Sequence, residues 1–127
     1  MVLSILVLAG SATAFYFSLQ PKGDTSKIVV NGRDYTWEGL FQRFTPVRFT
    51  ANGGTYSGVR LSDIINDTGL DDREGHRYKV TGADGYQKEF SWGDLLNGYL
   101  VREGKKTIFP GLTKSFWVRD VVRIEVV

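Results

Sequence analysis

The sequence predicts an α+β domain, a mixed β-sheet of short strands with small helices, preceded by one N-terminal membrane helix. Three observations lead to this prediction. Short runs rich in β-branched and aromatic residues recur along the chain, separated by Asn-Gly and other glycine-containing turns. Short segments with helical spacing follow serine or threonine residues, which favour helix N-caps. The first twenty residues carry no charged side chain.

The N-terminal segment has the length and composition of a membrane span. Val2 to Leu19 is mostly apolar, and as a helix it would extend roughly 27 Å, close to the hydrocarbon thickness of a bilayer. A signal peptide cut near Ala12-Thr13-Ala14 is the alternative, but no Lys or Arg precedes the apolar run, which favours an uncleaved anchor. We therefore expect an anchor or signal segment over residues 1–20, a linker over 21–26 and one domain over 27–127.

The side of the membrane is predicted from weaker signals. Single-span proteins with short N-terminal tails usually export the domain that follows, so we expect a membrane-anchored, extracytoplasmic domain. Lys22 and Lys27 after the segment argue for the opposite orientation.

The first half of the domain is predicted as a hairpin, a helix, a strand and a second helix. The predicted strands are Lys27–Val30, Arg33–Tyr35 and Val47–Thr50, and the predicted helices are Trp37–Phe44 and Ser62–Asn66. Asn31-Gly32 is typical of a type I′ turn, and Thr36 and Ser62 are the predicted caps. We expect Ala51–Thr55 to be a flexible loop and Gly58-Val59 to be a turn that enters the second helix.

The second half is predicted as two hairpins and a final strand. The predicted strands are Tyr78–Thr81, Gln87–Phe90, Tyr99–Arg102, Lys106–Phe109 and Val121–Val127. Ser91 is the predicted cap of a short helix over Trp92–Leu96. Trp117 is expected in the core, because its neighbours alternate as they do in a strand.

Composition excludes several kinds of site. The chain has no cysteine and one histidine, His76, so cysteine-based catalysis, disulfides and cysteine metal sites are impossible. A zinc or copper site would need carboxylates almost alone, which disfavours it. The basic residues are scattered and the net charge is +2, which argues against a nucleic-acid partner.

Three segments resemble the oxidoreductase molybdopterin-binding domain, which has the sulfite-oxidase-type fold. They are Tyr56-Ser57-Gly58-Val59-Arg60-Leu61, Val80-Thr81-Gly82-Ala83-Asp84-Gly85-Tyr86, and Lys114–Arg119 followed by Val122–Val126. The resemblance covers roughly Tyr35 to Val127 and implies that fold. In the family's enzymes, a cysteine in the loop after the strand that corresponds to Val47–Thr50 ligates molybdenum. Here that loop is Ala51-Asn52-Gly53-Gly54, so the resemblance implies the scaffold and argues against the chemistry.

The predicted ligand cleft comprises residues near the family's site. The candidates are Asn52, Gly53, Gly54, Tyr56, Arg60, Lys114, Trp117 and Arg119. Exposed amides of the glycine-containing loop and Lys114 would attract an anion, and Trp117 would stack on a flat ligand. For the loop, a hairpin turn that needs glycine is the competing interpretation.

These observations favour a membrane-anchored, non-catalytic binding or interaction module. The partners expected are the membrane, through the N-terminal helix, and a membrane or redox protein. No cofactor is expected, and only the family resemblance implies molybdopterin as a cofactor. Two alternatives stay open: a molybdopterin-dependent oxidoreductase or its subunit, and a receptor for a small anionic ligand.

Overall fold

The computed structural model describes residues 25–127. The predicted membrane helix over residues 1–20, and the linker as far as residue 24, lie outside this range. Among the described residues, no helix combines the length and the apolar composition that crossing a membrane requires.

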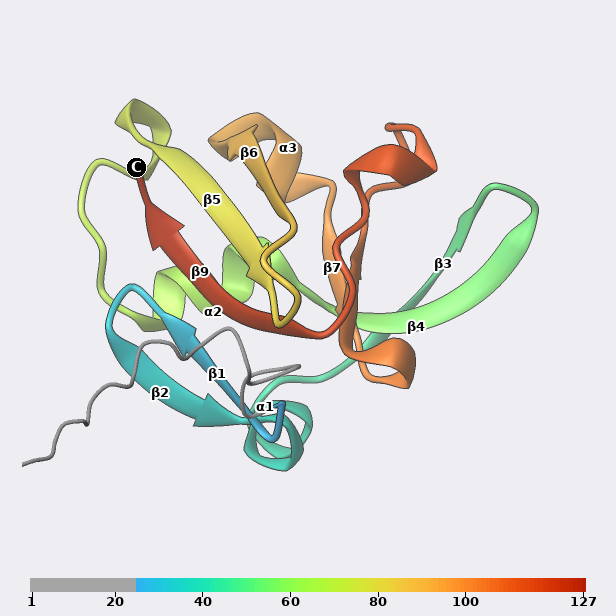
Figure 1. The fold of residues 1–127 in the computed structure, drawn as a ribbon, viewed down its shortest axis with the longest axis horizontal. Helices are drawn as coiled ribbons and strands as arrows, with labels where there is room; N and C mark the ends of the chain where they lie inside the picture. The colour runs from blue at the N-terminus through green and yellow to red at the C-terminus, as the bar shows by residue number, and fades with distance from the viewer. Residues whose placement is uncertain (1–24) are drawn as a thin grey trace, which may run out of the picture.

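The domain is α+β, as predicted, and its strands form two sheets with small helices beside them (Figure 1). The first sheet has the order β2-β1-β9-β5-β6 and the second has the order β3-β4-β7-β8. The strands are β1 (Lys27–Val30), β2 (Arg33–Thr36), β3 (Val47–Ala51), β4 (Gly54–Arg60), β5 (Arg77–Gly82), β6 (Gln87–Ser91), β7 (Tyr99–Val101), β8 (Lys106–Ile108) and β9 (Val121–Val126). The helices are α1 (Trp37–Arg43), α2 (Leu61–Asp67) and α3 (Trp92–Leu96), with short 3-10 turns η1 (Arg73–Gly75), η2 (Glu103–Lys105) and η3 (Lys114–Phe116).

The first sheet joins the two ends of the described chain. β1 runs parallel to β9, and the other strand pairs of this sheet are antiparallel. The predicted Asn31-Gly32 turn is confirmed, with φ of 49° and 82°, and the side-chain oxygen of Asn31 accepts a hydrogen bond from the backbone N–H of Val126. The alternation of buried and exposed residues along β9 breaks where the β5–β9 register shifts, so that Val121 and Ile124 are both buried.

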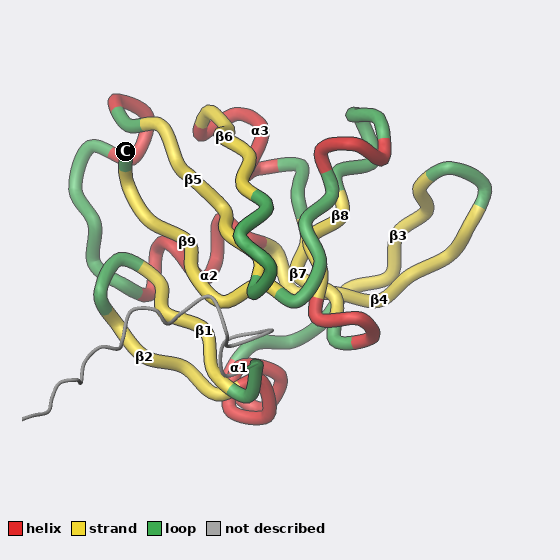
Figure 2. Tube along the Cα trace, viewed as in Figure 1, coloured by secondary structure: helices red, strands yellow, loops and turns green. Residues whose placement is uncertain are grey.

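The second sheet contains a strand that the sequence prediction missed. Gly54–Arg60, predicted as a loop followed by a turn, is the strand β4, and it pairs along its length with β3. The predicted flexible loop Ala51–Thr55 is a two-residue turn, because Ala51 pairs with Gly54 and leaves only Asn52 and Gly53 between the strands. Their φ values of 49° and 80° are those of a type I′ turn, the geometry that an Asn-Gly pair favours. Figure 2 shows this hairpin extending beyond the rest of the chain.

Two of the three predicted helix caps are confirmed. The Thr36 hydroxyl accepts a hydrogen bond from the Gly39 N–H, and Ser91 forms a reciprocal capping box with Asp94. The prediction that Ser62 caps the second helix is wrong. α2 begins one residue earlier, at Leu61, whose N–H donates to the carbonyl of Gly98, and Ser62 is buried within the first turn.

One main apolar cluster lies between the two sheets. β4 and β7 contribute Val59 and Leu100 to it, and the first sheet contributes residues such as Val80 and Phe90. All three α-helices add buried side chains. A smaller cluster of Ala51, Val101 and Ile108 lies on the other face of the second sheet. This second face carries the candidate site.

Candidate functional site

The outer face of the second sheet gathers aromatic and basic side chains, and we call it the aromatic–basic surface. It consists of Phe49, Tyr56, Arg60, Tyr99, Lys106, Lys114 and Trp117. The register places the strand residues together, because Phe49 opposes Tyr56, Arg60 opposes Tyr99 and Val101 opposes Lys106. Side chains that are paired across strands, or spaced by two along one strand, share a face of the sheet.

The rings pack closely because two glycines of β4 leave them room. Phe49 and Tyr99 stack across β4 with ring centroids 3.9 Å apart and an interplanar angle of 11°. Gly58 lies on the strand between them, and a Cβ there would be 2.8 Å from the carbonyl oxygen of Leu100. A Cβ on Gly54 would be 3.0 Å from the hydroxyl of Tyr56, so the absence of a side chain at Gly54 admits that ring. The alternating Gly-Tyr-Gly pattern of β4 therefore forms the floor of the surface.

Two lysines lie over the rings at one end of the surface. The Nζ of Lys106 is 5.6 Å from the ring centroid of Tyr56, and the Nζ of Lys114 is 5.6 Å from that of Trp117. The two rings meet edge to face, with centroids 6.1 Å apart. The ring faces attract the ammonium groups and hold them above the sheet. Neither lysine has an acidic partner within residues 25–127, so both charges are available to an anion.

Trp117 is positioned by the segment that runs beside β8. The Thr107 N–H donates to the carbonyl of Val118 at 2.9 Å, and the Val118 N–H donates to the Thr107 hydroxyl oxygen at 3.1 Å. The prediction of a strand-like run around Trp117 is wrong, since it follows the 3-10 turn η3 and is half-buried against both apolar clusters. Its indole Nε1 is buried and makes no hydrogen bond within the described residues.

The structure brings together half of the residues predicted for the cleft. Tyr56, Arg60, Lys114 and Trp117 belong to the aromatic–basic surface, and Gly54 lies under Tyr56.

The other predicted residues lie elsewhere. Asn52 and Gly53 form the exposed hairpin turn, and no hydrogen bond within residues 25–127 joins either of them to Lys114. Arg119 is exposed, and its carbonyl oxygen lies beside Gly82 at the end of β5. No ion pair, hydrogen bond or ring contact within residues 25–127 links the Arg119 side chain to the surface.

Phe49, Tyr99 and Lys106 belong to the surface but were not predicted. The signal for Phe49 was its alternation with Val47 and Ala51, which places all three on one face of a strand. This alternation places Phe49 at the site only when Gly54–Arg60 is recognised as the neighbouring strand. Gly58 of that strand has no side chain, which allows Phe49 to contact Tyr99.

The donor groups at this surface do not fit the molybdenum centre that the family resemblance implies. The turn that follows β3 offers an asparagine amide and backbone groups, where the resemblance implies a thiolate. The chain has no cysteine to supply that thiolate from another element. Within residues 25–127, no cluster of three or more His, Asp or Glu side chains is placed to hold a metal ion.

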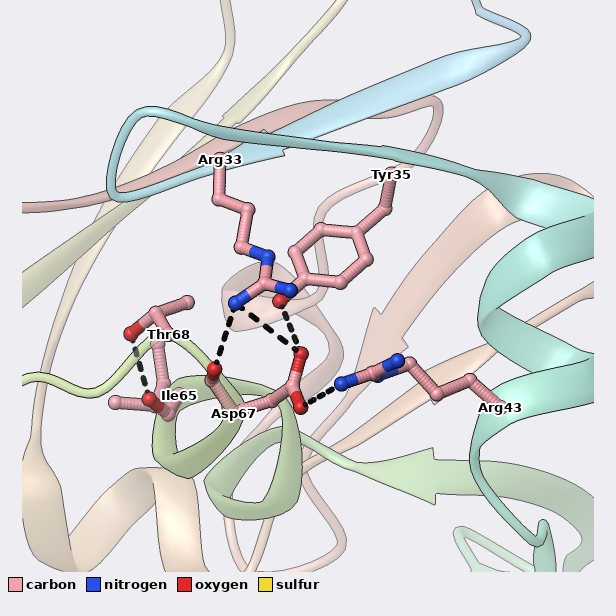
Figure 3. A network of polar contacts seen from close by, with 6 residues as sticks. All are labelled: Arg33, Tyr35, Arg43, Ile65, Asp67 and Thr68. Carbon is pink, nitrogen blue, oxygen red and sulfur yellow. Dashed lines mark hydrogen bonds and ion pairs between the residues drawn. The ribbon is translucent and has the colours of Figure 1, made fainter.

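A separate polar network joins the N-terminal hairpin and α1 to the end of α2 (Figure 3). The Tyr35 hydroxyl donates to Asp67 at 2.7 Å, and Arg43 donates to the other carboxylate oxygen at 2.5 Å. Arg33 donates to the Asp67 carbonyl at 3.0 Å. Because these three residues come from β2 and α1, the network fastens the N-terminal elements to α2.

The network shifts the ionisation of its members. Hydrogen bonds from Arg43 and Tyr35 stabilise the carboxylate and lower the pKa of Asp67. Burial, followed by the hydrogen bond to Asp67 and its charge, raises the pKa of Tyr35 to about 12. Every charged group of the network already has a partner, so we assign it a structural role.

No family model matches this chain, and no curated protein matches it significantly.

Proposed function

We propose that residues 27–127 are a non-catalytic binding or interaction module with the sulfite-oxidase-type fold, and that the aromatic–basic surface holds an anionic group of its partner. The N-terminal segment anchors the module to a membrane, with the domain on the extracytoplasmic side. The observation that carries the proposal is the pair of lysines, Lys106 and Lys114, held over Tyr56 and Trp117 without acidic partners among the described residues.

The three segments that resemble molybdopterin-binding domains support the proposed fold. Tyr56–Leu61 forms the junction of β4 and α2, and Val80–Tyr86 forms the end of β5 and its hairpin turn. Lys114–Val126 runs from η3 into β9. Each contributes to the main apolar cluster, for example through Val59, Val80 and Ile124. Residues that serve one common core support a shared scaffold, and scaffold likeness says nothing of the chemistry.

The chemistry of the surface supports binding over catalysis. Its polar side-chain groups are two ammonium groups, one guanidinium and the hydroxyls of Tyr56 and Tyr99. Ammonium and guanidinium groups bind carboxylates and phosphates, and the surface includes no carboxylate or imidazole that could act as a general base. We therefore favour recognition of an anion over a reaction on it.

The test is a titration of the full ¹⁵N-labelled chain with pyrophosphate, citrate and hexaglutamate, followed through the indole N–H signals. The chain has three tryptophans, so the Trp117 signal can be assigned by substitution. We expect at least one anion to shift the Trp117 signal, and we expect Lys106→Ala and Lys114→Ala to weaken that binding.

Lys88→Ala is the matched control, because Lys88 also lies over aromatic rings, Tyr86 and Phe116, but outside the surface. Its removal should leave the titration unchanged. If none of the three anions shifts the Trp117 signal, the proposed function is wrong. The same holds if Lys88→Ala weakens binding as much as the surface variants do.

A further inference from the structure

β3 is an edge strand whose outward backbone groups have no partner among the described residues. It ends the strand order β3-β4-β7-β8. The two-residue turn makes Ala51 and Gly54 a hydrogen-bonded pair, so Phe49 and Tyr56 form the next such pair. Arg48 and Thr50 fall between these pairs, and their N–H and C=O groups therefore point away from β4. No backbone hydrogen bond joins either residue to another element within residues 25–127.

The opposite edge of the same sheet is already covered. At β8, Thr107 exchanges hydrogen bonds with Val118, so a new strand cannot pair there without displacing that segment. β3 therefore offers the open edge of the second sheet. Open edges of this kind accept extended peptides, and main-chain hydrogen bonds then supply much of the affinity.

Charge indicates which peptide this edge accepts. The four strands of the second sheet contain Arg48, Arg60 and Lys106 and no acidic residue, and none of these three pairs with an acid within residues 25–127. In the first sheet, by contrast, Arg77 pairs with Glu89 and Lys79 pairs with Glu125. The edge and the face beside it are therefore complementary to an acidic segment.

The side chains of β3 also define the pattern of the incoming strand. Arg48 and Thr50 are exposed on one face, while Val47 and Phe49 are half-buried on the other. A strand that pairs with β3 places its residues alternately on these two faces. Acidic residues would therefore face Arg48, and apolar residues would extend the aromatic face.

The same surface is less suited to a single-stranded nucleic acid, which needs open ring faces for base stacking. Phe49 and Tyr99 already stack on each other, and lysines lie over the other two rings, Tyr56 and Trp117. A base would have to displace these groups, whereas a strand added beside β3 would leave them in place.

We propose that the β3 edge accepts an extended acidic segment of a partner protein as a fifth strand of the second sheet. This inference rests on the proposed function and gives it a partner class and a binding geometry.

The test measures binding of a labelled eight-residue peptide of alternating valine and glutamate to the full chain by fluorescence anisotropy. Thr50→Pro removes an outward N–H and blocks the edge, while the β3–β4 pairing stays intact because that N–H does not take part in it. Thr55→Pro is the matched control, since Thr55 lies directly opposite on β4 and its N–H points away from β3. We expect Thr50→Pro to weaken binding about tenfold or more through lost main-chain hydrogen bonds, and Thr55→Pro to leave it unchanged.

A second pair of variants tests the charge independently of the backbone. Arg48→Glu should weaken binding by about tenfold, because a close charge pair is replaced by repulsion. Arg123→Glu changes the net charge equally at an exposed position of β9 in the first sheet, and its effect should be smaller. A peptide of alternating valine and lysine should not bind.

Three results would overturn the inference: equal effects of the two proline variants, binding of the lysine peptide, or no binding of the glutamate peptide. Tighter binding of a single-stranded oligonucleotide or of anionic lipid vesicles, insensitive to Thr50→Pro, would also overturn it. Different results distinguish failure of strand addition from failure of the proposed function. If Lys114→Ala weakens peptide binding and Thr50→Pro does not, only strand addition is wrong. If, in addition, none of the simple anions shifts the Trp117 signal, then strand addition and the proposed anion-binding function are both wrong.

Discussion

The rings of Phe49 and Tyr99 stack face to face across an intervening strand, with their centroids 3.9 Å apart. They belong to β3 and β7, which do not pair with each other, and Gly58 of β4 lies between them. The contact joins the projecting hairpin to the body of the second sheet. It therefore connects the fold of this sheet to the shape of the aromatic–basic surface.

Gly58→Ala should destabilise the domain by about 1–3 kcal/mol, because the added Cβ meets a backbone oxygen that cannot move freely. The Cβ position is 2.8 Å from the Leu100 carbonyl oxygen. Urea unfolding measures the change. Gly111→Ala is the control, since nothing lies within 4 Å of its Cβ position. Equal stabilities of the two variants would contradict the packing described for Gly58.

Thr107→Val should weaken the attachment of the segment that carries Trp117. It leaves the Val118 N–H without its hydroxyl acceptor in a buried position, and a buried unpaired group costs about 1–3 kcal/mol. Thr107→Ser keeps the hydroxyl and should restore most of the loss. The readouts are the free energy of unfolding and the Trp117 indole signal. If the serine variant is as unstable as the valine variant, the hydrogen bond is not the cause.

Asp67 should make the domain less stable in acid. Its folded-state pKa lies below the unfolded value of about 3.9, so its stabilisation is present above about pH 4 and is lost as the pH falls through the folded value. Urea unfolding at pH 7 and pH 3 should show a smaller pH dependence for Asp67→Asn than for the natural chain. Asp63→Asn, at an exposed position of the same helix, provides the comparison. An unchanged pH dependence in Asp67→Asn would contradict the network of Figure 3.

Tyr35 should make the domain less stable at alkaline pH. Its folded-state pKa is raised to about 12, above the unfolded value of about 10. The stabilisation is therefore present below about pH 10 and is lost as the pH rises through the folded value. Burial also raises the pKa of Tyr78. Ultraviolet titration of the six tyrosines should therefore show a late step, from which Tyr35→Phe removes the contribution of one tyrosine near pH 12. A titration that the substitution leaves unchanged would contradict this assignment.

Local signals in the sequence predicted individual turns and helix caps well. The Asn31-Gly32 turn and the Thr36 and Ser91 caps each depend on a few neighbouring residues, so they can be recognised without knowing the fold. At Asn52-Gly53, the competing interpretation of a hairpin turn is the correct one. Gly53-Gly54 suggested a flexible loop and Gly58 a turn, whereas Gly54 and Gly58 lie in β4 and make room for neighbouring side chains.

The candidate site was predicted only in part because it depends on tertiary contacts. Tyr56, Lys114 and Trp117 were recognised, but Phe49 and Tyr99 join them through a stack between strands that do not pair. The position of Trp117 depends on the bonds between Thr107 and Val118, eleven residues apart. At Ser62, a local signal predicted a helix cap that the tertiary structure does not form. The Leu61 N–H donates to the Gly98 carbonyl, and the helix begins at Leu61 instead.

The central claim is that this scaffold binds an anionic partner without carrying the molybdenum cofactor of the enzymes it resembles. The most direct test is the molybdenum and pterin content, per mole of chain, of the full-length protein purified from membranes of its native host. The account predicts a content far below one equivalent. One equivalent of either component would contradict it.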